Sequence, residues 1–330
     1  MKKFIIKLIV FFGLAVAFWF FILVINGNGS DEKTFVIREG QGVNEISQEL
    51  YDVNLIKNKF VFETWLWLKK SEGKIIAGVY QMPKDISIRH LSNLLMIGPG
   101  QAQYAVTLLE GWTRELMKDT LEAAEIDADR FIKLSSQASD WQGIYDFLAD
   151  APSEASLEGY IFPDTYFVDK ATSEEDLIKK TLNNFDRKLN QDFRDEIKKQ
   201  GKTIFEVVTL AAIIEREVPN KEDKKMIADI FLKRLVAGIG LQSDATVNYV
   251  TGKGLAQPSY DDLQIDSPYN TYKYRGLPPG PIANPGLDSI EAVIYPTKND
   301  YYYFLTTKEG EVIYSIDYEE HLDNKAKYLD

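Results

Sequence analysis

The sequence predicts an α+β protein with a small N-terminal module and a larger domain behind an apolar segment. Three observations predict it: an uncharged N-terminal run, a strand–helix–helix–strand order after it, and a mainly helical region that ends in two short strands. With 330 residues, 45% of them hydrophobic, the chain can bury two cores. We expect an anchor at residues 1–25, a linker at 26–33, the small module at 34–105 and the larger domain at 106–330.

The N-terminal run is predicted to be a single transmembrane helix. Residues 8–25 are uncharged and almost wholly apolar, and about 20 such residues span a bilayer core. Lys2, Lys3 and Lys7 precede the run, which places the N-terminus in the cytoplasm and the rest of the chain outside. The only Ala-x-Ala pattern, residues 15–17, lies inside the run, so we favour an uncleaved anchor over a signal peptide.

Hydrophobic spacing predicts a β-α-α-β module after the linker. The expected elements are a strand at 34–38, helices at 42–55 and 60–68, a strand at 75–82 and a further helix at 86–97. With the segment Arg38-Glu39-Gly40-Gln41-Gly42, this order resembles a LysM-type glycan-binding module. A packing or spacing module that binds no sugar is the alternative.

The larger domain is predicted to open with a strand and to continue as helices. The expected elements are a strand at 106–109, helices at 113–124 and 128–135, one long helix from a capping box at Thr172 and Glu175 to near Gly201, an apolar helix from a capping box at Thr203 and Glu206, a helix at 288–294, strands at 301–306 and 312–316, and a terminal helix.

Composition excludes several classes of function. The chain has 38 basic and 50 acidic residues, and this net charge of −12 argues against a nucleic-acid partner. It has no cysteine, and its only histidines are His90 and His321, so a zinc site of the Cys/His kind cannot be assembled. Neither the nucleophile elbow Gly-x-Ser-x-Gly nor a phosphate-binding loop, a His-Glu-x-x-His motif or a dinucleotide fingerprint occurs. We expect no metal and no cofactor.

Two glutamates at the end of the apolar helix are candidate proton donors. Glu215 follows Val208, Ala211 and Ala212 at helical spacing, so its carboxyl should emerge beside small apolar side chains. Burial and the negative end of the helix dipole would raise its pKa, as a general acid requires. Glu217 lies just before a proline-induced break and is predicted to be less fixed. Alternatively, both carboxyls cap the helix end in solvent.

Candidate substrate-binding residues lie in three other blocks rich in carboxylates, amides and aromatic rings, which suit sugar hydroxyls and pyranose faces. They are Glu158, Asp164, Tyr166, Gln242, Asp244, Thr246, Tyr249, Tyr269, Asn270, Tyr272 and Asn284. Ordinary turn chemistry, a helix N-cap at Asp244 and core packing of the tyrosines are the alternatives. The last block, residues 267–286, contains five prolines and is predicted to form a stiff wall.

These blocks carry a family resemblance. Residues 157–166, 211–217, 241–249 and 267–286 resemble, in the same order, the YceG-like family of bacterial endolytic murein transglycosylases. The resemblance implies that Glu215 protonates the glycosidic oxygen between N-acetylmuramic acid and N-acetylglucosamine. The carboxylate would then accept the proton of the muramyl C6 hydroxyl, which closes a 1,6-anhydro ring. This route needs one carboxylate, whereas ordinary glycosidases need two.

The resemblance also implies a place of action and partners. We expect a lytic transglycosylase at the outer face of the bacterial cell membrane that cuts nascent peptidoglycan glycan strands, ends their elongation and contacts cell-wall synthases or other elongation and division proteins. Two alternatives remain at this point. One is a hydrolytic muramidase that pairs Glu215 with Asp244 or Glu158, and the other is a noncatalytic glycan-binding scaffold.

Overall fold

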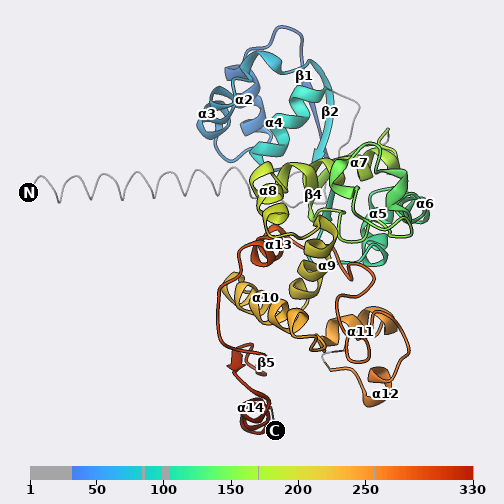
Figure 1. Cartoon of the computed structure of the whole chain (residues 1–330). Coiled ribbons are helices and arrows are strands. Elements are labelled where there is room, and N and C mark those ends of the chain that lie inside the picture. The colour runs from blue at the N-terminus through green and yellow to red at the C-terminus, as the bar shows by residue number, and fades with distance from the viewer. Residues whose placement is uncertain (1–31, 84–85, 99–103, 170, 256, 330) are drawn as a thin grey trace, which may run out of the picture. The chain divides into compact units, whose positions relative to one another are not determined.

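A computed structural model describes residues 32–83, 86–98, 104–169, 171–255 and 257–329. The described residues form two compact units, one within 32–104 with 169 and 171, and one within 105–168 and 172–329 (Figure 1). The predicted anchor and most of the linker lie outside the described residues. Within the described ranges, no helix has the length and apolar character needed to cross a bilayer.

The smaller unit has the predicted β-α-α-β order followed by a helix. Its elements are β1 (Glu32–Ile37), α2 (Val43–Asp52), α3 (Lys59–Leu68), the 3₁₀ turn η1 (Glu72–Lys74), β2 (Gly78–Pro83) and α4 (Ile88–Ile97). β1 and β2 pair antiparallel with Phe35 opposite Tyr80. Alternate residues of β1 face inward, so Phe35 and Ile37 are buried with Leu50 and Phe62 from the helices.

The larger unit begins with a short strand pair and small helices. Its first elements are β3 (Tyr104–Leu108), η2 (Glu115–Met117), α5 (Lys118–Ala123), α6 (Ala128–Leu134), η3 (Ala138–Asp140), η4 (Asp146–Leu148) and β4 (Asp164–Val168), which pairs with β3. Aromatic rings fill the space beneath them: Phe147 lies 4.8 Å from Phe185 and 5.9 Å from Tyr160, between ring centroids. The mixed α+β class is confirmed.

The long helix predicted from residue 172 to residue 201 is two helices, so that prediction was wrong. α7 (Glu174–Lys188) and α8 (Gln191–Lys199) are separated because Asn190 starts a new helix, its side chain accepting a hydrogen bond from the Phe193 amide at 3.1 Å. The capping box of α7 also differs from the predicted pair. It joins Ser173 to Asp176.

A buried helix, α9 (Ile204–Glu215), holds the centre of the larger unit. Its predicted capping box is present: Thr203 and Glu206 exchange hydrogen bonds between side chain and backbone. Residues 207–214 are all buried. α9 packs against α10 (Lys221–Val236) and α13 (Leu287–Ile294), which also pack on each other.

The remaining elements surround the far end of α9. They are α11 (Asp244–Thr251), α12 (Tyr260–Leu263), the antiparallel hairpin β5 (Tyr303–Thr306) and β6 (Val312–Ser315), and α14 (Tyr318–Tyr328), which packs on the hairpin. These elements occupy the orange and red part of Figure 1. They contribute the walls of the site described below.

Gly159 is the point of closest approach between three of the blocks singled out in the sequence. Its φ is +90°, and a Cβ there would lie 2.6 Å from Pro281 Cγ and 2.7 Å from Val208 Cγ1. An added methyl group would therefore push the proline-rich segment away from α9, in a backbone conformation that L-residues avoid.

We expect Gly159→Ala to lower the free energy of unfolding by about 2–4 kcal/mol, since overpacking and a left-handed backbone each cost about 1–3 kcal/mol. Gly238→Ala is the matched control, because its φ is +65° but no atom lies within 4 Å of the added Cβ. Urea unfolding of both variants measures the difference. Equal losses would show that the close contact at Gly159 contributes nothing.

Candidate active site

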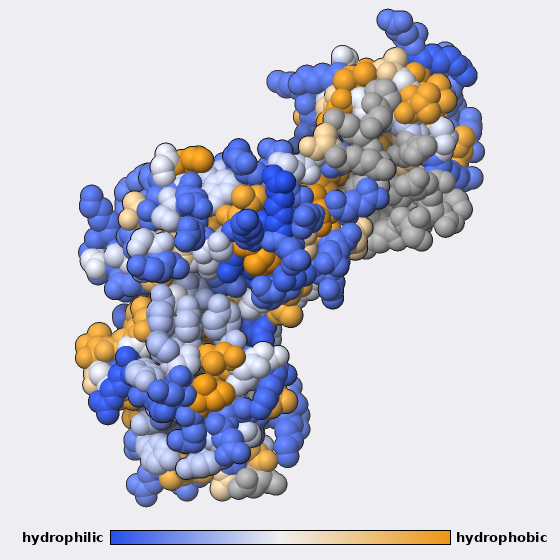
Figure 2. All heavy atoms as spheres, turned by 90° about the vertical axis from the view of Figure 1, so that its right-hand side faces the viewer, coloured by the Kyte–Doolittle hydropathy of each residue, from blue (hydrophilic) through white to orange (hydrophobic). Residues whose placement is uncertain are grey.

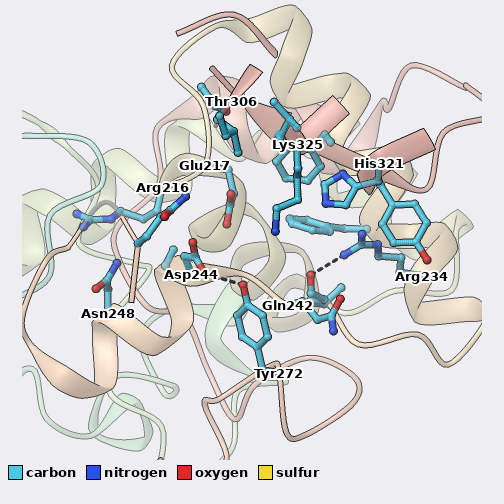
Figure 3. A pocket seen from close by; sticks show the side chains of 18 of the residues that line it. Arg216, Glu217, Arg234, Gln242, Asp244, Asn248, Tyr272, Thr306, His321 and Lys325 are labelled. Atoms are coloured by element: carbon cyan, nitrogen blue, oxygen red, sulfur yellow. Dashed lines mark hydrogen bonds between the residues drawn. The ribbon is translucent and has the colours of Figure 1, made fainter. Parts of the chain in front are cut away.

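A cavity of about 660 Å³ lies in the larger unit, beyond the C-terminal end of α9. Its walls come from α10, the segment before α11, α11 itself, β5 and α14 (Figure 3). The charged and polar residues that line it include Arg216, Glu217, Arg234, Gln242, Asp244, Asn248, Tyr272, His321 and Lys325. Carboxylates and cationic side chains thus line the same cavity.

Glu217 brings a carboxyl to this cavity from just beyond the end of α9. Its backbone amide donates to the Ile214 carbonyl at 3.1 Å, which continues the helix by one turn. The Ser243 hydroxyl donates to Glu217 Oε1, so the side chain is fixed, contrary to our prediction. Burial raises the pKa of Glu217 to about 7, with a further rise from Asp244, while Ser243 and Arg234 act to lower it. The Glu217 carboxyl therefore holds its proton more tightly than a solvent-exposed glutamate does.

Asp244 forms a second carboxyl of the cavity. The Tyr272 hydroxyl donates to Asp244 Oδ1 at 2.6 Å, and burial raises the pKa of Asp244. The N-cap of α11 is Ser243, which makes no side-chain capping bond, and Asp244 is the first helical residue. Gln242 precedes them with a φ of +52°, and its side chain also lines the cavity. Three of the predicted binding residues, Gln242, Asp244 and Tyr272, therefore line the same cavity.

Cationic and aromatic groups form the opposite wall. Arg234 donates to the carbonyls of Tyr302 and Leu241, both at 2.7 Å, and its guanidinium lies 4.9 Å from the centre of the Tyr303 ring. His321 stacks on Tyr303 at 5.4 Å, and its Nδ1 is a buried atom without a hydrogen-bond partner among the described residues. Burial lowers the pKa of His321. Lys325, also from α14, is exposed and points into the cavity in Figure 3.

Glu215 faces away from this cavity. Its carboxylate accepts hydrogen bonds from Lys224 Nζ at 2.8 Å, the Gly286 amide at 3.0 Å and Ser289 Oγ at 2.6 Å. Positions i and i+2 of a helix point to different sides, so Glu215 meets α10 and α13 while Glu217 meets the cavity. The prediction that apolar side chains surround the Glu215 carboxyl was therefore wrong. The carboxylate forms a buried ion pair with Lys224, and both of its oxygens accept hydrogen bonds.

Glu158 and Asn284 hold the fold together instead of lining the cavity. The Arg114 amide donates to Glu158 Oε1 at 3.1 Å, and Asn284 Nδ2 donates to the same oxygen at 2.6 Å. Asn284 Oδ1 in turn accepts the amides of Gly159 and Ile161. Burial raises the pKa of Glu158 to about 7, opposed by Arg114 and Asn284. The two residues cross-link the first block to the proline-rich block.

Six other predicted binding residues also lie outside the cavity lining. Tyr166 donates to the Phe162 carbonyl at 2.5 Å, Asn270 donates to the carbonyls of Leu263 and Ile265, and Thr246 bonds Thr271 at 2.9 Å. These three groups stabilise loops. Asp164 accepts from Asn184 at 3.0 Å, beside a shallow hollow formed with residues 107–110. Tyr249 and Tyr269 pack on each other at 5.1 Å.

The charged cavity residues that we did not predict, Arg216, Arg234 and Lys325, are all cationic, and His321 joins them. Arg216 stands between the two candidate glutamates, so the motif itself offered that signal. His321 and Lys325 are more than a hundred residues from Glu217 along the chain, and Arg234 lies in an ordinary amphipathic pattern. Only the packing of α14 on the hairpin brings His321 and Lys325 to the cavity.

The buried ion pair gives a stability prediction. Lys224→Met leaves the Glu215 carboxylate buried without its cation, which typically costs 3–5 kcal/mol, and we expect a loss of about that size in urea unfolding. Lys221→Met is the matched control, because Lys221 lies on the same helix as Lys224. It removes two more exposed ion pairs, with Asp288 and Glu291, and should lower the free energy of unfolding by about 1 kcal/mol or less. Similar losses for both variants would contradict a tight Glu215–Lys224 pair.

Comparison with known proteins places this geometry in a family. The sequence model of the YceG-like family matches residues 35–327. A protein of Bacillus subtilis named endolytic murein transglycosylase is 34% identical over 91% of this chain and 86% of its own length. A Streptococcus pneumoniae protein of the same name is 32% identical over 99% of this chain, which spans only 65% of that relative. The crystal structure of a putative YceG-like protein from Listeria monocytogenes covers 88% of this chain at 31% identity, with a TM-score of 0.63.

Proposed function

Because the chain belongs to the YceG-like family, we propose that it is an endolytic murein transglycosylase whose proton-transferring group is Glu217. The substrate is the glycan strand of peptidoglycan, and the product ends in 1,6-anhydro-N-acetylmuramic acid. The names of the relatives support the reaction. The observation that carries the assignment is a carboxyl with a pKa raised to about 7 that lines the large cavity.

One carboxyl suffices for both proton transfers. Protonated Glu217 donates its proton to the glycosidic oxygen while the bond from muramyl C1 to that oxygen breaks. The resulting carboxylate takes the proton of the C6 hydroxyl as O6 bonds to C1, which returns Glu217 to its protonated state. A pKa near 7 suits a group that must act as acid and then as base at neutral pH.

The neighbours of Glu217 support these steps. Ser243 fixes the carboxyl, and the negative charge of Asp244, held by Tyr272, would stabilise positive charge that develops on the sugar ring. Arg234 and Lys325 supply positive charge, and His321 a ring N–H, for the carboxylates of the stem peptides. The role predicted for Glu215 stays a prediction, and its closed set of partners favours a structural one.

A hydrolytic muramidase is the second candidate function, because two carboxylates, Glu217 and Asp244, line the same cavity. Such an enzyme would use the second carboxylate as nucleophile or base and would add water to the product. In a noncatalytic scaffold, by contrast, neither carboxyl would affect the glycan.

Location and partners follow from the N-terminal sequence. Residues 8–25 anchor the chain in the bacterial cell membrane with a cytoplasmic N-terminus, and the two units lie outside. The β-α-α-β unit is the LysM-like module, which contacts glycan. The enzyme thereby meets strands that emerge from membrane-bound cell-wall synthases and ends their elongation.

Substitution of the two glutamates separates their roles. We expect Glu217→Gln to lower turnover of purified glycan strands by roughly 10²–10⁴-fold, the contribution of general acid–base catalysis. Glu215→Gln, the matched control, should lower stability more than turnover, because it disturbs the pair with Lys224. If Glu217→Gln kept its turnover while a folded Glu215→Gln lost it, Glu215 would be the proton-transferring group.

The products separate transglycosylase, hydrolase and scaffold. In ¹⁸O-labelled water, mass analysis of the wild-type products should find 1,6-anhydromuramic ends that carry no label. Labelled reducing ends would establish hydrolysis and point to Asp244 as the second carboxylate. Release of no product from strands of any length would favour the scaffold.

The pH dependence of kcat/KM should carry the signature of Glu217. We expect it to fall above pH 7, because the acid is lost as pH rises through a pKa of about 7. Ser243→Ala removes a bond that lowers this pKa, so the fall should move to higher pH. Asp244→Asn removes a charge that raises it, so the fall should move to lower pH. If kcat/KM falls at the same pH in both variants and in the wild type, the fall reflects the titration of another group, such as Glu158.

A further inference from the structure

The smaller unit exposes large apolar side chains that its core does not use. α3 turns Val61, Phe62 and Leu66 inward, yet Phe60 is 70% exposed, Trp67 63% and Leu68 56%. Phe60 and Trp67 are seven residues apart, which places them on one side of a helix, two turns from each other. Such a group on one short helix is unusual for a surface that meets only water.

Lysines are frequent in the segment that carries these side chains. Within residues 57–74 there are five lysines and two glutamates, a net of +3 in a chain whose net charge is −12. The lysines, all exposed, are Lys57, Lys59, Lys69, Lys70 and Lys74. Lys70 also lines a shallow hollow with Trp67, Leu68 and Gly73. We call Phe60, Trp67, Leu68 and these five lysines the α3 face.

The chain enters the unit at β1, which contacts the segment between α2 and α3. β1 begins at Glu32, and Lys33 Nζ donates to the carbonyl of Val53, which lies just before α3 along the chain. Six residues, 26–31, separate the apolar run from β1. Even fully extended, they span only about 20 Å. If residues 8–25 cross the bilayer, the start of α3 is held near its surface.

We propose that the α3 face lies on the surface of an anionic bilayer, with Phe60, Trp67 and Leu68 at the level of the headgroups and the lysines on lipid phosphates. Aromatic side chains favour this interface, and lysines beside them add attraction to anionic lipids. The inference rests on the proposed membrane anchor and is independent of the proposed reaction.

A glycan strand is the competing occupant, because Trp67 offers a flat ring for stacking on a pyranose. Sugar platforms pair rings with hydrogen-bonding groups that meet the hydroxyls, whereas the hollow at Trp67 has Glu72 as its only carboxylate and is otherwise lined by Leu68, Lys70 and Gly73. Three exposed apolar side chains in a segment with five exposed lysines match a lipid surface better than a neutral sugar.

The lack of cysteine allows a site-specific test in the full chain. Leu68→Cys and Val236→Cys each receive a nitroxide label, and each protein is reconstituted in phosphatidylcholine vesicles with and without phosphatidylglycerol. Val236 is 91% exposed in the larger unit and serves as the control. Collision with oxygen, which enters lipid, and with a water-soluble nickel complex reports the depth of each label. Flotation of the vesicles separately checks that the chain is anchored, so a failed anchor is recognised as such.

The proposal expects the label at position 68 to collide with oxygen and to be protected from nickel, most strongly in the anionic vesicles, while the label at position 236 stays in water. Phe60→Glu with Trp67→Glu, both at exposed positions, should return the label at position 68 to water without changing the circular dichroism spectrum. Lys57→Glu with Lys70→Glu should abolish the preference for anionic lipid.

Three outcomes overturn it. Full access of nickel to position 68 shows a face in water. Protection from nickel and oxygen alike shows that protein covers the face. Protection that appears only when soluble glycan strands are added identifies a sugar-binding surface instead.

Discussion

The ion pair between Glu215 and Lys224 determines how the candidate site is built. It ties the end of α9 to α10, and the Gly286 amide and Ser289 hydroxyl tie the same carboxylate to the start of α13. Because this carboxylate is buried, its partners must be retained, since an unpaired buried charge is costly. The rotation of α9 about its axis is thereby set, and the next carboxyl, on Glu217, can only face the other way, into the cavity.

The order of elements could be predicted from sequence because it depends on local periodicity. The β-α-α-β unit, the Thr203 capping box and the C-terminal hairpin each have short-range signals. The break between α7 and α8 was missed because the amphipathic pattern continues across Asn190, and only the cap at that residue reveals the break.

The candidate site was harder to predict because it depends on which way each side chain points. Gln242, Asp244 and Tyr272, which we predicted because their blocks are rich in polar and aromatic groups, do line the cavity, and their role in binding stays a prediction. Glu158 and Asn284 have the same composition but bond each other in the interior. The sequence Glu215-Arg216-Glu217 does not indicate which glutamate pairs with Lys224. Lys224 lies in the following helix, and the packing of the two helices determines the pairing.

The walls of the cavity bear on the choice between ring closure and hydrolysis. Both reactions begin with protonation by Glu217, and they differ in whether the C6 hydroxyl or water reaches C1. Exclusion of water therefore favours the intramolecular route. Phe231, Phe304 and Leu305 give the cavity an apolar side, and α14 covers the hairpin that supplies two of them. The last elements of the chain thus bear on the proposed choice of product, although the proposed proton donor, Glu217, lies about a hundred residues earlier along the chain, just beyond the end of α9.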